Sequence, residues 1–266
     1  MKFTKKIMTM ATCAIMLGGI ATGNSDISFK NYESFSTNAV IIDDSPLLKV
    51  SSTSNSNFDQ RVVQLYAVYS DGTNSYTTGF IVGDHKIASC AHGLYKADKG
   101  GYPEYVNVYV KRCGSSTYDT NYSFKLTYSS EKQNIVVHDD YKTTGSNKYD
   151  IGIITTTKDL SALGKFTLNT AYTPNKTTPH TYTVKGYPME VGYENYHKYQ
   201  CYSSGNYKTS DSNILRYYAS TLSGMSGAPV IYDNKVVAIN VGNIDSDYTQ
   251  YNYGTRNISW LNNHIS

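Results

Sequence analysis

The sequence predicts an all-β protein, built either as a β-sandwich or as a pair of β-barrels. From Arg61 onward, short β-prone stretches alternate with turn residues. Until the C-terminal end, the apolar residues show no sustained helical period. Many short strands with regularly spaced turns are typical of sandwiches and barrels. The 266 residues allow one large β domain or two small ones, with ample apolar material for a core.

The expected strands fall into two sets, each bounded by turn residues such as Asp71-Gly72. The first set lies at 61–69, 78–82, 86–89, 105–111, 122–128 and 151–155, and the second at 181–186, 197–202, 214–219, 229–232 and 235–241. At the end of the chain, Ile258, Leu261 and Ile265 are spaced by three and four residues. This spacing predicts one short amphipathic helix over 258–265.

The N-terminal region has the pattern of a signal peptide. Three lysines precede a short apolar run over residues 7–20, which is too short for a comfortable membrane span. Small residues then predict cleavage after Gly23, so that 1–23 is the signal peptide; an uncleaved anchor is the alternative. We therefore expect a secreted, extracellular protein that has no membrane contact after cleavage. Residues 24–38 are polar and rich in turn residues, which favours a propeptide, and a disordered lead-in over 24–57 is the alternative.

Charge and cysteine content narrow the partners further. The net charge is only +3, which argues against nucleic acid or an anionic membrane as a partner. No cluster of metal-ligand residues stands out, so we expect neither a metal nor another cofactor. Cys90, Cys113 and Cys201 remain after export, and their odd number allows at most one disulfide. A Cys113–Cys201 bridge is one option, while Cys90 is expected to pack as a small apolar residue behind His92.

A glycine-flanked serine provides the strongest functional signal. Ser226 lies in the stretch Ser223-Gly224-Met225-Ser226-Gly227-Ala228-Pro229-Val230. Gly224 and Gly227 allow a tight turn and a close approach of the backbone to a ligand. In such a turn the amides of Gly224 and Ser226 can converge beside the hydroxyl, as in an oxyanion hole next to a nucleophile. A β-turn with an incidental serine is the alternative for this stretch taken alone.

Two upstream stretches supply the partners that a nucleophilic serine needs. His92 follows a predicted strand and precedes a glycine, and Asp150 stands at the head of the apolar run Ile151-Gly152-Ile153-Ile154. A histidine can act as the general base for Ser226, and a buried carboxylate can fix its tautomer and stabilise the imidazolium. Asp139 and Asp140 are weaker candidates, because they lie in a hydrophilic run. The order His, Asp, Ser is that of chymotrypsin and differs from the order in α/β-hydrolases.

With these motifs in this order, the chain resembles the secreted, chymotrypsin-fold serine peptidases of Gram-positive bacteria, in the glutamyl endopeptidase (V8-like) group. The resemblance runs from about Ala39 to the end of the chain. The matching stretches are Ala39–Asp44, Thr78–Gly83, Ala91–Tyr95, Tyr149–Gly152, Gly186–Pro188, Gly224–Pro229 and Tyr253–Arg256.

The resemblance implies two antiparallel six-stranded β-barrels and a short C-terminal helix. The peptidase domain would span 39–266, with the first barrel at about 58–160, the second at 161–257 and the helix at 258–265. It also implies peptide-bond hydrolysis by His92, Asp150 and Ser226, with Gly224 and Ser226 forming the oxyanion hole. A second cut near Asn38 would free a new amino terminus that helps to bind an acidic substrate side chain. The expected partners are protein or peptide substrates, and we expect a monomer.

Specificity is where the resemblance is weakest. Thr221 matches the residue that lines the family's S1 pocket, and Asn240 occupies the position where glutamate-specific relatives carry histidine. Asparagine can donate a hydrogen bond to a carboxylate but adds no charge. The strand from Val241 to Asn243 is expected to pair with the substrate backbone. Around Ser220 the pocket floor lacks the acid that a trypsin-like enzyme needs, so a preference for acidic P1 residues is the first expectation.

Two other functions stay open at this point. One is a toxin-like protease that is restricted to one target protein, which the altered residue Asn240 favours. The other is a largely non-catalytic binding protein on the same fold, which would use the surface formed by some of the 27 tyrosines.

Overall fold

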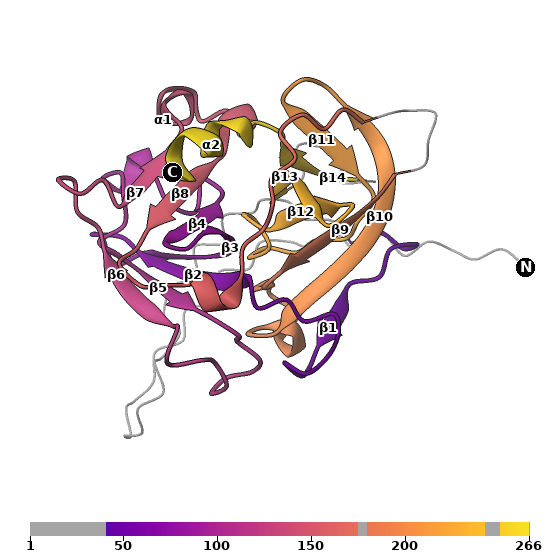
Figure 1. Ribbon diagram of the computed structural model, residues 1–266, viewed down its shortest axis with the longest axis horizontal. Coiled ribbons are helices and arrows are strands. Elements are labelled where there is room, and N and C mark those ends of the chain that lie inside the picture. Colours follow the sequence, from indigo (N-terminus) through magenta and orange to yellow (C-terminus); the bar gives the residue numbers. More distant parts are fainter. Residues whose placement is uncertain (1–40, 175–179, 243–250, 266) are drawn as a thin grey trace, which may run out of the picture. The chain divides into compact units, whose positions relative to one another are not determined.

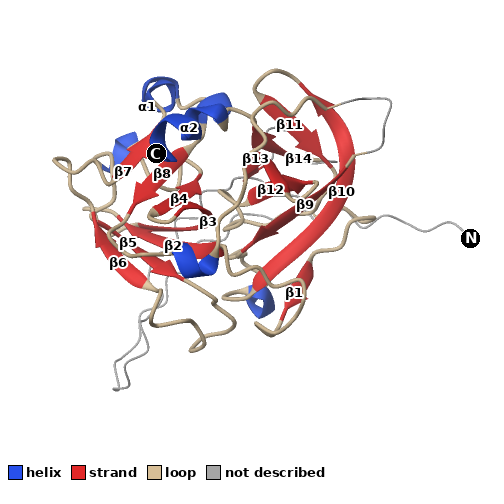
Figure 2. Ribbon diagram, in the orientation of Figure 1, coloured by secondary structure: helices blue, strands red, loops and turns tan. Residues whose placement is uncertain are grey.

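The computed structural model describes residues 41–174, 180–242 and 251–265. These residues belong to one compact unit that spans 32–266. The predicted signal peptide (1–23), the predicted propeptide (24–38) and Asn243 lie outside the described residues. Two antiparallel sheets dominate the described part of the chain (Figures 1 and 2).

The first sheet contains seven strands in the order β6-β5-β2-β3-β4-β8-β7. Its strands are β2 (Val62–Val68), β3 (Asn74–Gly83), β4 (Lys86–Ser89), β5 (Tyr105–Tyr109), β6 (Phe124–Thr127), β7 (Ile135–Val137) and β8 (Gly152–Thr155). The sheet has one face toward a core: along β5 every second residue is buried, because successive side chains in a strand point to opposite faces. The inner residues, among them Leu65, Ile87 and Val106, form one apolar cluster.

The second sheet contains a closed barrel. Strands β9 (Thr181–Gly186), β10 (Gln200–Ser210), β11 (Ile214–Tyr217), β14 (Asn252–Thr255), β13 (Lys235–Gly242) and β12 (Pro229–Tyr232) follow one another, and β12 pairs again with β9. The short strand β1 (Leu48–Val50) adds to β10 from outside the ring. Because β10 is long, it pairs with β1, β9 and β11 along its length.

Within the described ranges, helical structure is confined to short connections and to the C-terminal end. Helix α1 covers Asp139–Thr144 and helix α2 covers Ser259–Ile265, with 3₁₀ turns at Ala97–Lys99, Asn147–Tyr149, Ser161–Leu163 and Glu194–Tyr196. Helix α2 lies beside the first sheet (Figure 1), and its Leu261 is fully buried. None of the helices in the described ranges has the length and apolar character needed to cross a membrane.

The predicted all-β fold with a short C-terminal helix is confirmed. The second half forms the expected six-stranded barrel, whereas the first half forms a curled sheet whose edge strands β6 and β7 do not pair in the described residues. A shared apolar cluster joins the two halves. It includes Phe80 from β3, Val236 and Ile239 from β13, and Ile258 ahead of α2. The backbone N–H of Thr78 in β3 also donates to the carbonyl of Ser226, 2.8 Å away, which ties the glycine-flanked serine to the first sheet.

Candidate active site

His92 lies just after strand β4, in a short turn that the fold holds rigidly. The turn begins at Cys90, and the carbonyl of Ala91 accepts hydrogen bonds from the backbone N–H groups of Leu94 and Tyr95. Gly93 is required here, because a Cβ at this position would lie 2.5 Å from Thr77 Cγ2. The imidazole of His92 keeps a side-chain exposure of 20%, so it is held in place while staying accessible.

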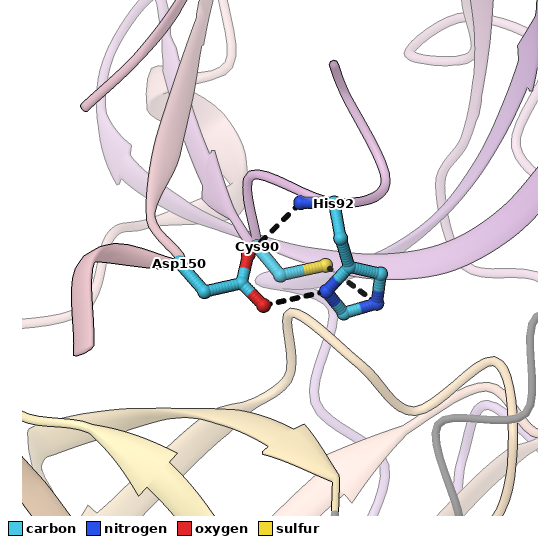
Figure 3. Close-up of side chains that lie close together, drawn as sticks. All are labelled: Cys90, His92 and Asp150. Atoms are coloured by element: carbon cyan, nitrogen blue, oxygen red, sulfur yellow. Dashed lines mark hydrogen bonds and ion pairs between the residues drawn. The ribbon is translucent and has the colours of Figure 1, made fainter. Parts of the chain in front are cut away.

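Asp150, which lies shortly before strand β8, contacts His92. Its Oδ2 lies 2.6 Å from His92 Nδ1, and its Oδ1 accepts a hydrogen bond of 2.9 Å from the backbone N–H of His92 (Figure 3). Because Asp150 is fully buried, this carboxylate needs a specific partner. The two contacts fix both the position and the tautomer of the ring, with the proton on Nδ1 and Nε2 left to act as a base.

The electrostatics of the pair favour the imidazolium. Burial opposes protonation of the ring, but the negative charge of Asp150 outweighs it and raises the pKa of His92 well above its ordinary value. A protonated intermediate on His92 is therefore stabilised, as general base catalysis requires.

Ser226 lies on a tight turn between β11 and β12 and is 3% exposed. The nearby residues Gly224 and Gly227 have φ values of +89° and +87°, a backbone region that residues other than glycine rarely adopt. Ser226 Oγ donates a hydrogen bond to the carbonyl of Val241, 3.0 Å away. Rotation of the hydroxyl away from Val241 would free it to approach a base or a substrate carbonyl.

The turn also orients the backbone amides predicted to form an oxyanion hole. The carbonyl of Ser223 accepts a 2.7 Å bond from the N–H of Met189, which points the N–H of Gly224, in the same peptide group, the opposite way. In the described part of the chain this Gly224 N–H makes no hydrogen bond to another protein group. It is thus available to an external acceptor, as an oxyanion-hole donor must be.

Two residues that support this turn were not identified from the sequence. Thr78 Oγ1 donates to the carbonyl of Gly224 (2.9 Å) and accepts from the N–H of Tyr187 (2.9 Å). Glu190 Oε2 accepts from the N–H of Ser223 at 3.0 Å. Neither has a motif of its own in the sequence, although Thr78 begins the matching stretch Thr78–Gly83.

The structure brings the predicted pocket residues Thr221 and Asn240 close to this turn. Thr221 is fully buried, and its Oγ1 has no hydrogen-bond partner among the described residues. An unpaired buried hydroxyl is costly, which makes this atom a candidate to bind a substrate group.

Asn240 is held from both ends of its amide. Its Oδ1 accepts a 2.6 Å bond from the hydroxyl of Tyr217, and its Nδ2 donates a 2.9 Å bond to the carbonyl of Met225. Asn240 is 1% exposed, and its bond to Met225 links β13 to the Ser226 turn. One of the two N–H groups of the Asn240 amide is therefore used within the protein, and the role of the second toward a substrate carboxylate stays a prediction.

Val241 lies at an irregularity in the pairing of β13 with β14. Asn240 pairs with Gly254 and Gly242 pairs with Tyr253, so Val241 has no partner residue of its own. Bulges of this kind re-aim the backbone and are common next to active sites. The other residue predicted to bind the substrate backbone, Asn243, lies outside the described residues.

The three cysteines in the described ranges are free thiols, and the optional Cys113–Cys201 disulfide is not formed. Burial raises the pKa of the Cys201 thiol. Cys90 is buried as expected, but its environment is polar: Sγ lies 3.7 Å from His92 Nε2 (Figure 3).

Comparisons with known proteins identify the family of the chain. Residues 77–239 match the family model described as "Trypsin-like peptidase domain", a range that includes His92, Asp150 and Ser226. A search of curated proteins gave no match.

Several solved structures share the fold. A Glu endopeptidase in complex with MPD is 23% identical, with a TM-score of 0.68, over 85% of this chain and 99% of that one. The protease Anisep from Arthrobacter nicotinovorans is 15% identical, with a TM-score of 0.61, over 83% and 99% of the two chains. HL collagenase is 13% identical, with a TM-score of 0.62, over 85% and 100%. The family match covers more than half of the sequence, and the chain therefore belongs to the trypsin-like peptidase domain family.

Proposed function

We propose that this protein is a secreted serine endopeptidase that hydrolyses peptide bonds through an acyl-enzyme on Ser226. The observation that carries the proposal is the buried contact between Asp150 Oδ2 and His92 Nδ1 at 2.6 Å. A buried carboxylate that orients a partly exposed imidazole is the pairing that a nucleophilic serine such as Ser226 needs for acyl transfer.

In the proposed reaction, the Ser226 hydroxyl leaves the carbonyl of Val241 and attacks the scissile carbonyl carbon. His92 Nε2 takes the hydroxyl proton and later gives it to the leaving amine, while Asp150 stabilises the imidazolium. The N–H groups of Gly224 and Ser226 stabilise the tetrahedral oxyanion, at about 3–4 kcal/mol for each donor in comparable sites. Water then attacks the acyl-enzyme with His92 again acting as the base.

The test compares purified wild type with the Ser226→Ala and His92→Ala variants on a mixed peptide library, read by mass spectrometry. We expect cleavage by the wild type and a loss of about 10⁶-fold in kcat for each variant. Equal cleavage by wild type and Ser226→Ala would overturn the proposal. If neither protein cleaves any peptide, the non-catalytic alternative gains support. Mass spectrometry of the secreted protein gives the true amino terminus, which tests cleavage after Gly23 and near Asn38.

A preference for acidic P1 residues is the finer part of the proposal. Support comes from the unpaired hydroxyl of Thr221 and from the absence of an acid at its neighbour Ser220. The N-terminal segment also reaches this region: the N–H of Ile42 donates to Ser220 Oγ at 2.6 Å. An amino terminus freed shortly before Ile42 would therefore add a positive charge within a few residues of the pocket floor.

Matched peptide substrates with Glu, Gln or Leu at P1 test this preference. We expect the wild type to favour Glu, and Thr221→Val to lose about 1–3 kcal/mol of that preference, which is about 5- to 150-fold in kcat/KM. A wild-type preference for Leu over Glu would contradict the acidic assignment but leave the serine mechanism intact.

One observation favours the second candidate, a protease restricted to one target. Asn240 is held by Tyr217 and Met225 and carries no charge, so the pocket lacks the positive charge that a protonated histidine can supply in the resembled family. A wild-type enzyme that leaves every short peptide intact but cleaves one folded protein, dependent on Ser226, would establish this candidate.

A further inference from the structure

We propose that Cys90 and His92 form a binding site for a thiophilic divalent cation such as Zn²⁺, and that the bound ion inhibits the enzyme. Thiolate sulfur and imidazole nitrogen are the ligands that Zn²⁺ prefers. Cys90 Sγ, His92 and Asp150 form the one cluster of possible metal ligands found in the described ranges, with ligand atoms all within 4.8 Å of one another.

The spacing of the two ligand atoms suits a shared ion. With Zn–S of about 2.3 Å, Zn–N of about 2.0–2.1 Å and a tetrahedral angle, sulfur and nitrogen lie about 3.5 Å apart. In this structure Cys90 Sγ and His92 Nε2 are 3.7 Å apart. A small shift of the thiol is then enough to bring both atoms to one ion.

The second ring nitrogen is already arranged as in known zinc sites. A histidine that binds zinc almost always donates its other N–H to a carboxylate or carbonyl, which fixes the ring and makes the ligand nitrogen more basic. Asp150 takes this role on Nδ1, with its oxygen 2.6 Å away, as the dashed line in Figure 3 shows. Cys90, one of the two ligands, and Asp150, which orients the other ligand, are both fully buried.

Binding would involve a simple exchange. Zn²⁺ replaces the thiol proton of Cys90 and any proton held on His92 Nε2, both of which are released to solvent, and accepts the lone pair of that nitrogen. Water would fill the remaining positions, so we expect weaker binding than at a structural site with four protein ligands. Because His92 Nε2 is then coordinated, it cannot accept the proton of Ser226. The binding claim stands alone, whereas the inhibition claim rests on the proposed peptidase function.

Binding is tested first, on the Ser226→Ala variant, so that activity plays no part. Co²⁺ serves as the spectroscopic probe, because a Co²⁺–thiolate bond gives a charge-transfer absorption, and Zn²⁺ titration calorimetry gives the affinity. We expect one site with a thiolate band. Adding Cys90→Ala should remove the band and weaken Zn²⁺ binding by more than about tenfold. Adding Cys113→Ala, at a partly exposed thiol, should change neither.

Inhibition is then measured on enzymes that carry Ser226. Zn²⁺ should inhibit wild type and Cys113→Ala alike, reversibly by a chelator, while Cys90→Ala should need at least about tenfold more Zn²⁺, relative to its own metal-free rate. Cys90→Ser, which keeps the side-chain size, replaces Cys90→Ala if the latter melts early. Unchanged binding in the Cys90 variants would overturn the site. A protein that binds Co²⁺ through Cys90 but cleaves no peptide would instead overturn the proposed function.

Discussion

At the scale of single residues, the chemistry depends on how Asp150 holds His92. One carboxylate contacts both the ring and the backbone N–H of the same histidine, so the imidazole has little freedom to turn. The same contact sets the charge of the ring, because Asp150 raises the pKa of His92 well above its ordinary value. Geometry and protonation therefore both depend on this buried carboxylate, with Cys90 adding to the rise in the pKa of His92.

This coupling predicts the pH profile of the enzyme. Neutral His92 is the active base, so kcat/KM should fall as the pH drops through the raised pKa of His92, above the ordinary value of 6.5. In Asp150→Asn the charge is gone, so this acid limb should move to lower pH while kcat falls about 10⁴-fold. The measurement is kcat/KM as a function of pH for both proteins. An acid limb at the same pH in both would show that Asp150 does not set the pKa of His92.

Two adjacent threonines provide a matched pair. Thr78 Oγ1 makes two buried hydrogen bonds, to Gly224 and Tyr187, whereas Thr77 Oγ1 is buried without a partner in the described residues. Thr78→Val should cost about 1–3 kcal/mol of unfolding free energy and lower kcat, because the turn of Gly224 loosens. Thr77→Val should be neutral or stabilising. Denaturant unfolding and peptide kinetics check both, and equal effects would contradict this role of Thr78.

At the scale of elements, the Ser226 turn is hydrogen-bonded to both sheets. Its backbone bonds to Thr78 in the first sheet, and Gly227 N–H donates to the carbonyl of Asn240 in β13. The packing leaves no room for a side chain at Gly227, where a Cβ would lie 2.1 Å from the carbonyl oxygen of Thr78.

Gly227→Ala should therefore be severely destabilising, by more than about 4 kcal/mol, and should prevent accumulation of folded enzyme. Gly72→Ala is the control, because Gly72 has a similar φ of +81° but nothing within 4 Å of an added Cβ. It should cost only about 1–2 kcal/mol of backbone strain. Thermal unfolding of the two variants measures the difference in stability. Similar losses of stability would show that backbone strain, and not the contact with Thr78, causes the destabilisation.

The elements also show what the sequence can and cannot predict. His92, Asp150 and Ser226 are each marked by local patterns of glycine and apolar residues, so the sequence alone is enough to predict all three as candidates. Thr78 and Glu190 support the same turn from positions 146 and 33 residues away in the chain. The Thr78 contact depends on how the two sheets come together and the Glu190 contact on how loops of the second barrel pack, and local patterns encode neither.

At the scale of the whole molecule, the N-terminal segment joins the second barrel behind the predicted S1 pocket. Ser45 Oγ contacts Ser203 Oγ and donates to the carbonyl of Ser204, both at 2.7 Å, and it accepts a longer bond from the N–H of Ser220. Ser45 is 3% exposed, so this network is buried. Residues far apart in the chain thus meet at Ser220, the predicted pocket floor.

Ser45→Ala should lower the unfolding free energy by about 1–3 kcal/mol, because it leaves buried partners unsatisfied. It should also raise KM for substrates with acidic P1 residues more than kcat changes. Ser52→Ala is the matched control, since Ser52 is exposed and its side chain bonds only within residues 52–54. Unfolding curves and peptide kinetics provide both readouts. An unchanged KM in Ser45→Ala would show that the N-terminal segment does not contribute to substrate binding.

The most direct test of a peptidase built on Ser226 is covalent trapping of the enzyme by a fluorophosphonate probe, followed by mass spectrometry of the labelled peptide. We expect one label per chain, on Ser226, with labelling abolished in Ser226→Ala and strongly slowed in His92→Ala. Labelling at another residue, or no labelling of a folded and fully processed wild-type protein, would contradict the account.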